Sequence, residues 1–306
     1  MNTADLELFT RIADCGSITA SAEQLGLSPA TASAALKRLE KQLDSQLFIR
    51  STRQLRLTSE GEHFLMFCRQ ALIALEEGKA SLHAIKGKIS GELRLSMPSD
   101  LGRNIVVPWI DEMMSRHPEL SIKLHISDNL SDFYLDRVDV ALRYGAPQDS
   151  SMIAFQIASI DRIIIASPKY TSAFGAPQHP EDLRQHNCLV FRLGNRAYDR
   201  WDMVRGGEQF RIPVSGDRES DDAEIVRRWA RAGRGIAFKS ELDVKRELDS
   251  GKLIRLLPEY QSKPVGLWLI CPSRKQVTPA VLQLRDFLRN KVSEELTHLD
   301  GPLSQS

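Results

Sequence analysis

Residues 17–43, SITASAEQLGLSPATASAALKRLEKQL, predict two short helices joined by a tight turn. Ser17 can cap the first helix, and Gly26 falls in the turn. Ser28 can cap the second helix, whose first residue would be Pro29, where a missing N–H does no harm. This arrangement is typical of a helix-turn-helix, in which the second helix enters the major groove of DNA and its early residues meet base edges.

Charge along the second helix favours contact with DNA. Small polar residues stand at its start, cations follow towards its end, and a basic ribbon comes next. Residues 28–56 carry six cations against Glu40 and Asp44, so six minus two gives a local charge of +4, whereas the whole chain carries +1. The six cations are Lys37, Arg38, Lys41, Arg50, Arg53 and Arg56. A local basic patch is typical of phosphate binding, although a solvated basic face on an ordinary helical hairpin stays open as an alternative.

One further helix precedes this pair, and a ribbon follows it. Residues 5–13 carry apolar side chains at helical spacing. The ribbon would pair residues 47–50 with residues 54–57 and turn at residues 51–53. We therefore expect residues 1–58 to form a mostly helical, winged helix-turn-helix domain.

A long helix is predicted from about residue 59 to about residue 86, in a linker and dimerisation segment that spans residues 59–87. Its apolar positions alternate spacings of three and four, which is the signature of a helix seam. The leucines expected in this seam are Leu65, Leu72, Leu75 and Leu82. We expect the seam to pair with a second copy of the chain, and packing against its own chain is the alternative.

The pattern changes after the linker at residues 87–91, and residues 88–306 read as an α/β domain. Strands are expected at residues 93–97, 120–126, 138–143, 153–157, 162–167, 188–191, 235–239 and 265–271. Short helices are expected at residues 132–136 and 222–232, the second capped by Asp221 with Glu224 three residues later. Gly206 and Gly207 predict a hairpin. Repeated strand–helix–strand units predict largely parallel sheets with helices on both faces.

Composition and motifs argue against several classes of protein. The start of the chain lacks the pattern of a signal peptide, and no apolar run approaches the roughly 20 residues of a membrane helix. We therefore expect a cytoplasmic protein that has no membrane partner. The patterns GxSxG, HExxH and GxxxxGKS/T are missing from the sequence, so we expect no enzyme activity, no metal and no cofactor. A plain solute-binding module is a third possibility, which the N-terminal helices disfavour.

Four cysteines are scattered along the chain without a CxxC pair: Cys15, Cys68, Cys188 and Cys271. We expect buried, reduced thiols, because a free cysteine usually behaves as a small hydrophobic residue. A redox pair between Cys188 and Cys271 stays open.

Residues 5–65 resemble the winged helix-turn-helix of LysR-type transcriptional regulators over their whole length. The motifs FxxIAxxGS, AExLxLS, KRLExQL, LFxR and LTxEG occur in order. The remainder resembles the effector domain of that family more loosely, in GELRLSMPSDLG, VDVALRYG and ARAGRGIAF.

The resemblance implies a periplasmic-binding-protein-like domain of two α/β subdomains. One would comprise residues 91–161 plus 267–292, and the other residues 162–266. It also implies a homodimer or homotetramer that binds double-stranded DNA and a small-molecule effector, with RNA polymerase as a further candidate partner.

Candidate DNA contacts follow from the predicted helices, the ribbon and the resemblance. Many family members carry Arg or Gln just after the serine that matches Ser33, but this chain has Ala34 and Ala35 there. Base reading would then rest on Ser28, Thr31, Ser33 and Lys37, while Arg50, Arg53 and Lys37 would supply phosphate contacts. The expected DNA-binding residues are Ser17, Thr19, Ser28, Pro29, Ala30, Thr31, Ser33, Lys37, Arg50, Thr52 and Arg53.

Candidate effector contacts lie where predicted strands end and helices begin, because ligands of open parallel sheets bind there. They are Ser99, Asp100, Asp128, Arg143, Phe191, Arg192, Asp221 and Phe238. Ser99 matches a family position whose hydroxyl and helix amides often hold an effector carboxylate. Arg143 and Arg192 could clamp the same anion, so we expect a small organic anion. The alternative is that these arginines form structural ion pairs with Asp100, Asp128 or Asp221. Asp100 and Asp128 also leave a cationic or amino ligand open.

Overall fold

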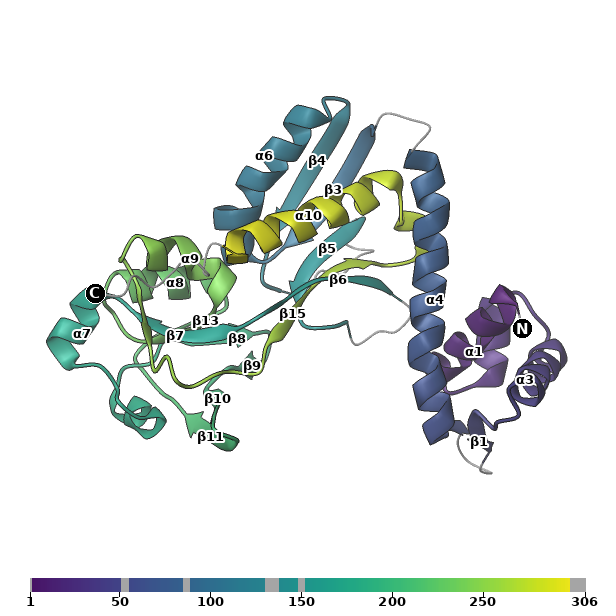
Figure 1. The fold of residues 1–306 in the computed structure, drawn as a ribbon, viewed down its shortest axis with the longest axis horizontal. Helices are drawn as coiled ribbons and strands as arrows, with labels where there is room; N and C mark the ends of the chain where they lie inside the picture. Colours follow the sequence, from purple (N-terminus) through teal and green to yellow (C-terminus); the bar gives the residue numbers. More distant parts are fainter. Residues whose placement is uncertain (1, 51–54, 85–88, 130–137, 148–151, 298–306) are drawn as a thin grey trace. The chain divides into compact units, whose positions relative to one another are not determined.

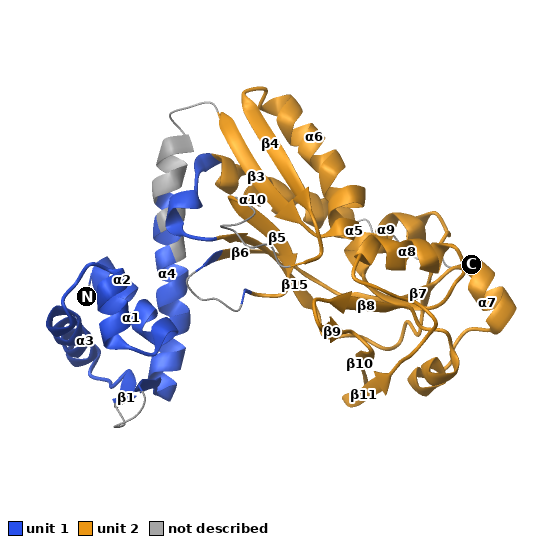
Figure 2. Cartoon of the chain, turned by 180° about the vertical axis from the view of Figure 1, so that it is seen from behind, with its two compact units in different colours: residues 1–87, 147–153, 272–279 blue, residues 88–146, 154–271, 280–306 orange. Residues whose placement is uncertain are grey.

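The computed structural model describes residues 2–50, 55–84, 89–129, 138–147 and 152–297. The chain divides into two compact units (Figure 1, Figure 2). The first unit comprises residues 1–87, 147–153 and 272–279, and the second comprises the rest. The helix expected at residues 132–136 lies outside the described residues. Within the described ranges, no helix is long and apolar enough to cross a membrane.

The described part of the first unit is mostly helical. Its elements are α1 (Thr3–Cys15), α2 (Ile18–Gln24), α3 (Pro29–Leu43), β1 (Phe48–Arg50), β2 (Leu55–Leu57) and α4 (Ser59–Ala84). Helices α2 and α3 begin as predicted, because the Ser17 and Ser28 hydroxyls accept hydrogen bonds from the amides of Ala20 (3.3 Å) and Thr31 (3.1 Å). Strands β1 and β2 pair antiparallel and form the wing.

One hydrophobic core joins these helices. The apolar faces of α1 and α3 meet the first half of α4 around Phe9, Leu36 and Leu39. The Phe9 ring contacts the rings of Phe48 on β1 and Phe64 on α4, each at a centroid distance of 5.5 Å. The helix-turn-helix and its wing are therefore held on α4 by a shared core, so part of the apolar seam of α4 packs against its own chain, which was the alternative to pairing with a second copy.

A five-stranded sheet organises one half of the second unit, which we call the first lobe. The strand order is β4-β3-β5-β15-β6. The strands are β3 (Gly91–Met97), β4 (Leu120–Ile126), β5 (Val140–Tyr144), β6 (Ile153–Ile160) and β15 (Val265–Cys271). The helices of this lobe are α5 (Ser99–Leu101), a π-helical turn (Gly102–Val106), α6 (Val107–Arg116) and α10 (Pro279–Thr297). Helices α6 and α10 (Figure 1) are tied by an ion pair between Glu112 and Lys291 at 2.7 Å.

A three-stranded sheet, β13-β7-β14, organises the second lobe. Its strands are β7 (Arg162–Ala166), β13 (Ala237–Ser240) and β14 (Ile254–Leu256). The smaller strands of this lobe are β8 (Val190–Leu193), β9 (Arg196–Ala197), β12 (Glu219–Ser220) and the hairpin β10 (Arg200–Arg205) and β11 (Glu208–Pro213). The helices are α7 (Pro168–Phe174), a 3-10 helix (Pro180–Gln185), α8 (Ala223–Arg231) and α9 (Glu241–Asp249). Helix α5 of the first lobe contacts α8 and α9, so the lobes meet there.

Two expectations for this unit are wrong. The sheets are mixed rather than largely parallel, because β15 runs antiparallel to β5, and both neighbours of β7 run antiparallel to it. The cap of α8 is Asp222, not Asp221: the Asp222 carboxylate accepts hydrogen bonds from the amides of Glu224 (2.9 Å) and Ile225 (3.2 Å). The helix begins one residue later than predicted, and Glu224 stands two residues after the cap, so the predicted capping box of Asp221 and Glu224 is not formed.

Candidate functional site

Helix α3 presents one face to the surface and buries the other. Ala32, Leu36 and Leu39 are buried in the core of the first unit. The exposed positions are Pro29, Ala30, Thr31, Ala34, Lys37, Arg38, Lys41 and Gln42, with Ser28 just before them and Ser33 half-buried beside them. The predicted base-reading residues and the predicted cations therefore share the surface of one helix.

The start of α3 is held by its own hydroxyl groups. Ser28 Oγ lies 2.8 Å from Thr31 Oγ1 and also accepts the amide of Thr31. Both side chains stay exposed, so each keeps capacity to donate to or accept from another group. On α2, Thr19 is exposed and the capping residue Ser17 is half-buried.

Two of the cations on α3 stand without an ion pair in the described part of the chain, Lys37 and Lys41. Arg38 differs, because its guanidinium pairs with the buried carboxylate of Asp5 on α1. Lys37 and Lys41 are therefore available for phosphates, whereas Arg38 also ties α3 to α1.

The wing is positioned by residues that the site prediction did not single out. The Glu40 carboxylate on α3 accepts hydrogen bonds from the amides of Leu47 (2.9 Å) and Phe48 (3.2 Å), where β1 begins. Thr58 donates its hydroxyl to the Gln46 carbonyl (2.7 Å) and accepts the amide of Gly61 (2.9 Å). The motifs KRLExQL and LTxEG contain Glu40, Thr58 and Gly61, so the motifs themselves were the signal that could have singled these residues out. Thr52, Arg53 and the side chain of Arg50 lie outside the described residues.

Helix α4 divides its apolar residues between its own chain and the surface. Leu65 and Leu72 are buried in the core of the first unit. Leu75 is 46% exposed, and Met66 and Phe67 are exposed to a similar degree. The side chain of Leu82 lies outside the described residues. Packing against its own chain thus accounts for Leu65 and Leu72, while Leu75 belongs to a separate exposed apolar face.

Ser99 lies where the two lobes meet. Its amide donates to Asp128 Oδ1 (3.0 Å), and its hydroxyl donates to Asp128 Oδ2. The same hydroxyl lies 2.9 Å from Asp222 Oδ1 and accepts the amide of Glu224 at 3.2 Å. The Asp128 carboxylate also accepts the amide of Ala223, at 2.8 Å. Ser99 and Asp128, both predicted as effector contacts, are therefore brought together, and α8 joins them.

Asp100 is the centre of a buried ion-pair cluster that crosses the same junction. It is 1% exposed and pairs with Arg227 of α8 (2.8 Å) and with Lys239 of β13. Arg227 also pairs with Glu224 (2.7 Å) and with Glu247 of α9. Lys239 donates further to the Ala223 carbonyl at 3.1 Å. Arg227 and Lys239 were not predicted, although Glu224 and Arg227 stand three residues apart on one helix, a spacing that signals an ion pair.

Burial and charge act against each other in this cluster. Burial raises the pKa of Asp100 to about 8, although the neighbouring Lys239 charge opposes the rise. Burial would also raise the pKa of Glu224, but hydrogen bonds from Arg228 and Arg227 outweigh it and hold that pKa at about 2. Buried ion pairs are weak evidence for stability but costly to break from one side. The cluster therefore makes the junction of the lobes sensitive to any single charge change.

The two arginines of the predicted clamp have other partners. Arg143 is buried, donates to Ser96 Oγ (2.7 Å) and to the Leu142 carbonyl (2.9 Å), and its burial lowers its pKa to about 10. Arg192 is 40% exposed and pairs with Glu219 at 2.6 Å. Arg192 therefore forms a structural ion pair, which was the alternative to a ligand clamp, but its partner is Glu219 and not Asp100, Asp128 or Asp221.

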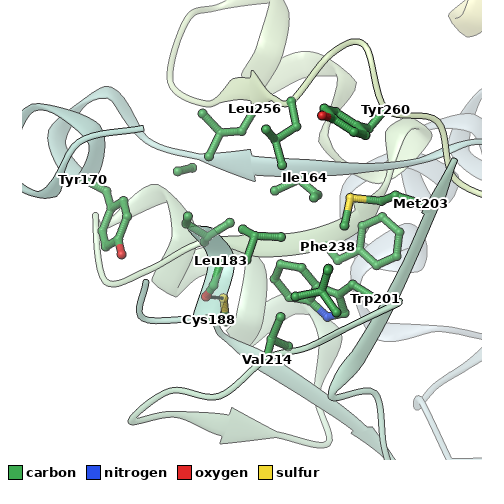
Figure 3. Close-up of a cluster of buried hydrophobic side chains, with 14 residues drawn as sticks. Ile164, Tyr170, Leu183, Cys188, Trp201, Met203, Val214, Phe238, Leu256 and Tyr260 are labelled. Atoms are coloured by element: carbon green, nitrogen blue, oxygen red, sulfur yellow. Dashed lines mark hydrogen bonds between the residues drawn. The ribbon is translucent and has the colours of Figure 1, made fainter. Parts of the chain in front are cut away.

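The predicted aromatic contacts fall in two different environments. Phe238 belongs to the core of the second lobe, where its ring lies 5.5 Å from that of Trp201 (Figure 3). The Arg162 guanidinium stands 4.2 Å from the centre of the same ring. Phe191 is half-buried and stacks on Tyr198 at 5.8 Å. Asp221 is exposed, and Asp222 takes the place at the junction that we assigned to it.

The chemistry available here is that of binding. Among the described residues, no group of three or more His, Cys, Asp or Glu side chains could hold a metal ion. All four cysteines are free, and only Cys15 is not buried. The helix amides, hydroxyls and ion pairs at the junction can hold or release a polar ligand.

Comparison with protein families gives two matches that together span most of the chain. Residues 3–62 match the family described as bacterial regulatory helix-turn-helix protein, lysR family, and residues 86–293 match the LysR substrate binding domain. These ranges cover α1 to the start of α4, and β3 to α10.

Similar proteins and solved structures agree with both matches. DmlR, an HTH-type transcriptional regulator of Escherichia coli K12, is 31% identical over 290 residues, which cover 95% of this chain and 94% of DmlR. TtdR, an HTH-type transcriptional activator of the same strain, is 31% identical over 266 residues, which cover 87% of this chain and 86% of TtdR. Full-length AphB of Vibrio cholerae is 28% identical, with a TM-score of 0.56 over 95% of this chain and 99% of AphB. CrgA of Neisseria meningitidis is 27% identical, with a TM-score of 0.60 over 96% of this chain and 99% of CrgA.

Proposed function

We propose a specific mode of action for this chain, which belongs to the LysR-type transcriptional regulators and is a DNA-binding regulator rather than an enzyme. The exposed face of α3 enters the major groove. Ser28, Thr31 and half-buried Ser33 meet base edges, and Lys37 contacts a phosphate. The observation that carries this proposal is the common surface of the hydroxyls and unpaired lysines on α3.

We propose further that the protein binds DNA as a homodimer. The exposed residues Phe67 and Leu75 on α4 supply an apolar face, which a second copy of α4 would cover. Two winged helix-turn-helix domains would then reach two half-sites of one operator.

The effector, in this proposal, is a small organic anion bound between the two α/β subdomains. Support comes from the donors at the junction, which are the amide and hydroxyl of Ser99 and the first amides of α8. Binding there would act on contacts that join the lobes, and so on the arrangement of the dimer that holds DNA. The arginine clamp receives less support, because Arg143 and Arg192 already have partners.

A ligand screen tests the effector class. All four tryptophans, Trp109, Trp201, Trp229 and Trp268, lie in the second unit, so tryptophan fluorescence of the full chain follows the unfolding of that unit alone. Organic acids and amines are added in parallel, and a ligand of the native state raises the melting temperature. We expect an organic acid to stabilise the parent and to bind more weakly to Ser99→Ala. Stabilisation by amines alone would reject the anion.

A further inference from the structure

Asp128 is held by donors from both lobes. Its Oδ1 accepts the amide of Ser99 at 3.0 Å, and its Oδ2 accepts the Ser99 hydroxyl. The same Oδ2 accepts the amide of Ala223, the first residue of α8, at 2.8 Å. Asp128 follows β4 of the first lobe, whereas Ala223 belongs to the second. The Asp128 carboxylate therefore accepts hydrogen bonds from the first lobe at both oxygens and from the second lobe at Oδ2.

We infer that Asp128 is an internal ligand, which supplies from the chain itself the carboxylate that the donors at the junction require. This inference rests on the proposed function, since these are the donors proposed for the effector anion. An external carboxylate can then bind them only by displacing Asp128. Asp128 thereby determines which ligands can bind at these donors. It also determines how strongly the two lobes are joined when no ligand is bound.

The charges around Ser99 support displacement over joint occupancy. The Ser99 hydroxyl has one proton, and it lies between Asp128 Oδ2 and Asp222 Oδ1, which is 2.9 Å away. Asp222 uses its carboxylate to cap α8 and to pair with Arg103 at 3.3 Å. A third carboxylate placed beside these two would meet like charges, and the donors of Ser99 and Ala223 are already bonded to Asp128. Exchange with Asp128 leaves one carboxylate on these donors and the same number of hydrogen bonds to them.

Chemical rescue tests this role directly. Asp128→Ala removes the carboxylate and leaves room for formate, the smallest carboxylate. We expect the variant of the full chain to lose about 4 °C or more in melting temperature, followed by tryptophan fluorescence. Sodium formate should restore about half of that loss or more in a saturable way, because it binds only the native state. Sodium chloride at equal concentration should restore little, and formate should leave the parent unchanged.

Matched variants separate an occupied site from a general salt effect. Asp221→Ala removes an exposed carboxylate from the segment that leads into α8 and should respond to neither salt. Asp128→Asn keeps the size of the side chain, leaves no space, and should lose stability without formate rescue. The double variant of Asp128→Ala with Ser99→Ala should lose part of the rescue, because it lacks the Ser99 hydroxyl, one of the three donors, and keeps the amides of residue 99 and Ala223.

The outcomes distinguish this role from the proposed effector class, because the rescue needs neither effector nor DNA. If Asp128→Ala folds only when purified in formate and unfolds when chloride replaces it, the role of Asp128 is supported. Equal effects of formate and chloride, or a variant as stable as the parent, would overturn it. Rescue by formate alongside a parent that responds to no organic acid would reject the proposed effector and leave the internal ligand standing.

Discussion

A Cβ atom on Gly61 would lie 2.2 Å from the carbonyl oxygen of Leu47. Gly61 is in the first turn of α4, and Leu47 leads into the wing at β1. The same Leu47 carbonyl accepts the amide of Thr58 at 3.0 Å, so it cannot move away without losing that bond. The approach of helix to wing therefore requires glycine at residue 61, and this explains the glycine of the LTxEG motif in physical terms.

Replacing Gly61 by alanine should destabilise the first unit by about 1–3 kcal/mol, as overpacking typically does. Hydrogen exchange measured on peptides from α1 to α4 would show faster exchange and isolate the effect to this unit. Gly78→Ala on the same helix is the matched control, because an added Cβ there meets nothing within 4 Å. That variant should gain about 0.5–1 kcal/mol from the better helix propensity of alanine. Equal effects of the two variants would contradict the account of the wing.

A charge on either face of α4 should have different consequences. Leu75→Glu places a charge on the exposed apolar face, so it should abolish the dimer and leave the first unit folded. Leu72→Glu buries an unpaired charge in the core of the same chain, where Leu72 is only 5% exposed, and should unfold the unit. Sedimentation gives the mass, and hydrogen exchange gives the folding. A folded, fully dimeric Leu75→Glu protein would show that this face does not form the dimer.

The cysteines should differ in reactivity towards iodoacetamide. Burial raises the pKa of Cys68 to about 11 and the pKa of Cys188 and Cys271 to about 12. Since the thiolate is the reactive form, these three should stay unlabelled at about pH 8. Only the half-buried Cys15 should react. Mass spectrometry should count one label on the native chain and four after denaturation, and rapid labelling of Cys188 and Cys271 would revive a redox role.

The local signals in the sequence predicted the first unit well. Caps at Ser17 and Ser28, the turn at Gly26 and the apolar spacing of α3 are interactions between residues a few positions apart, so a short stretch of chain contains all the partners. The residues that hold the wing are harder to see. Glu40 accepts amides seven and eight residues away, and nothing in a helical pattern distinguishes it from a solvated glutamate.

The junction of the lobes was predicted in part. Ser99 and Asp128 follow successive parallel strands, so strand ends alone bring them near each other. The partners of Asp100 come from α8 and β13, more than 120 residues away, and only the packing of the two lobes decides them. The antiparallel partners of β7 escaped prediction for the same reason. Apolar periodicity reports which residues are buried, and it carries no information on strand direction.

The most direct test of the central claim is salt-dependent binding of the full chain to DNA. The parent first selects an operator from random duplexes, and affinities for operator and random DNA are then measured over a series of salt concentrations. Lys37→Ala should weaken both complexes alike and reduce the slope of log affinity against log salt by about 1. Thr31→Ala should cost about 1–3 kcal/mol on the operator and little on random DNA. Lys252→Ala, an exposed lysine of the second unit, should change neither. If Lys37→Ala and Thr31→Ala both bind like the parent, α3 does not read DNA and the account is wrong.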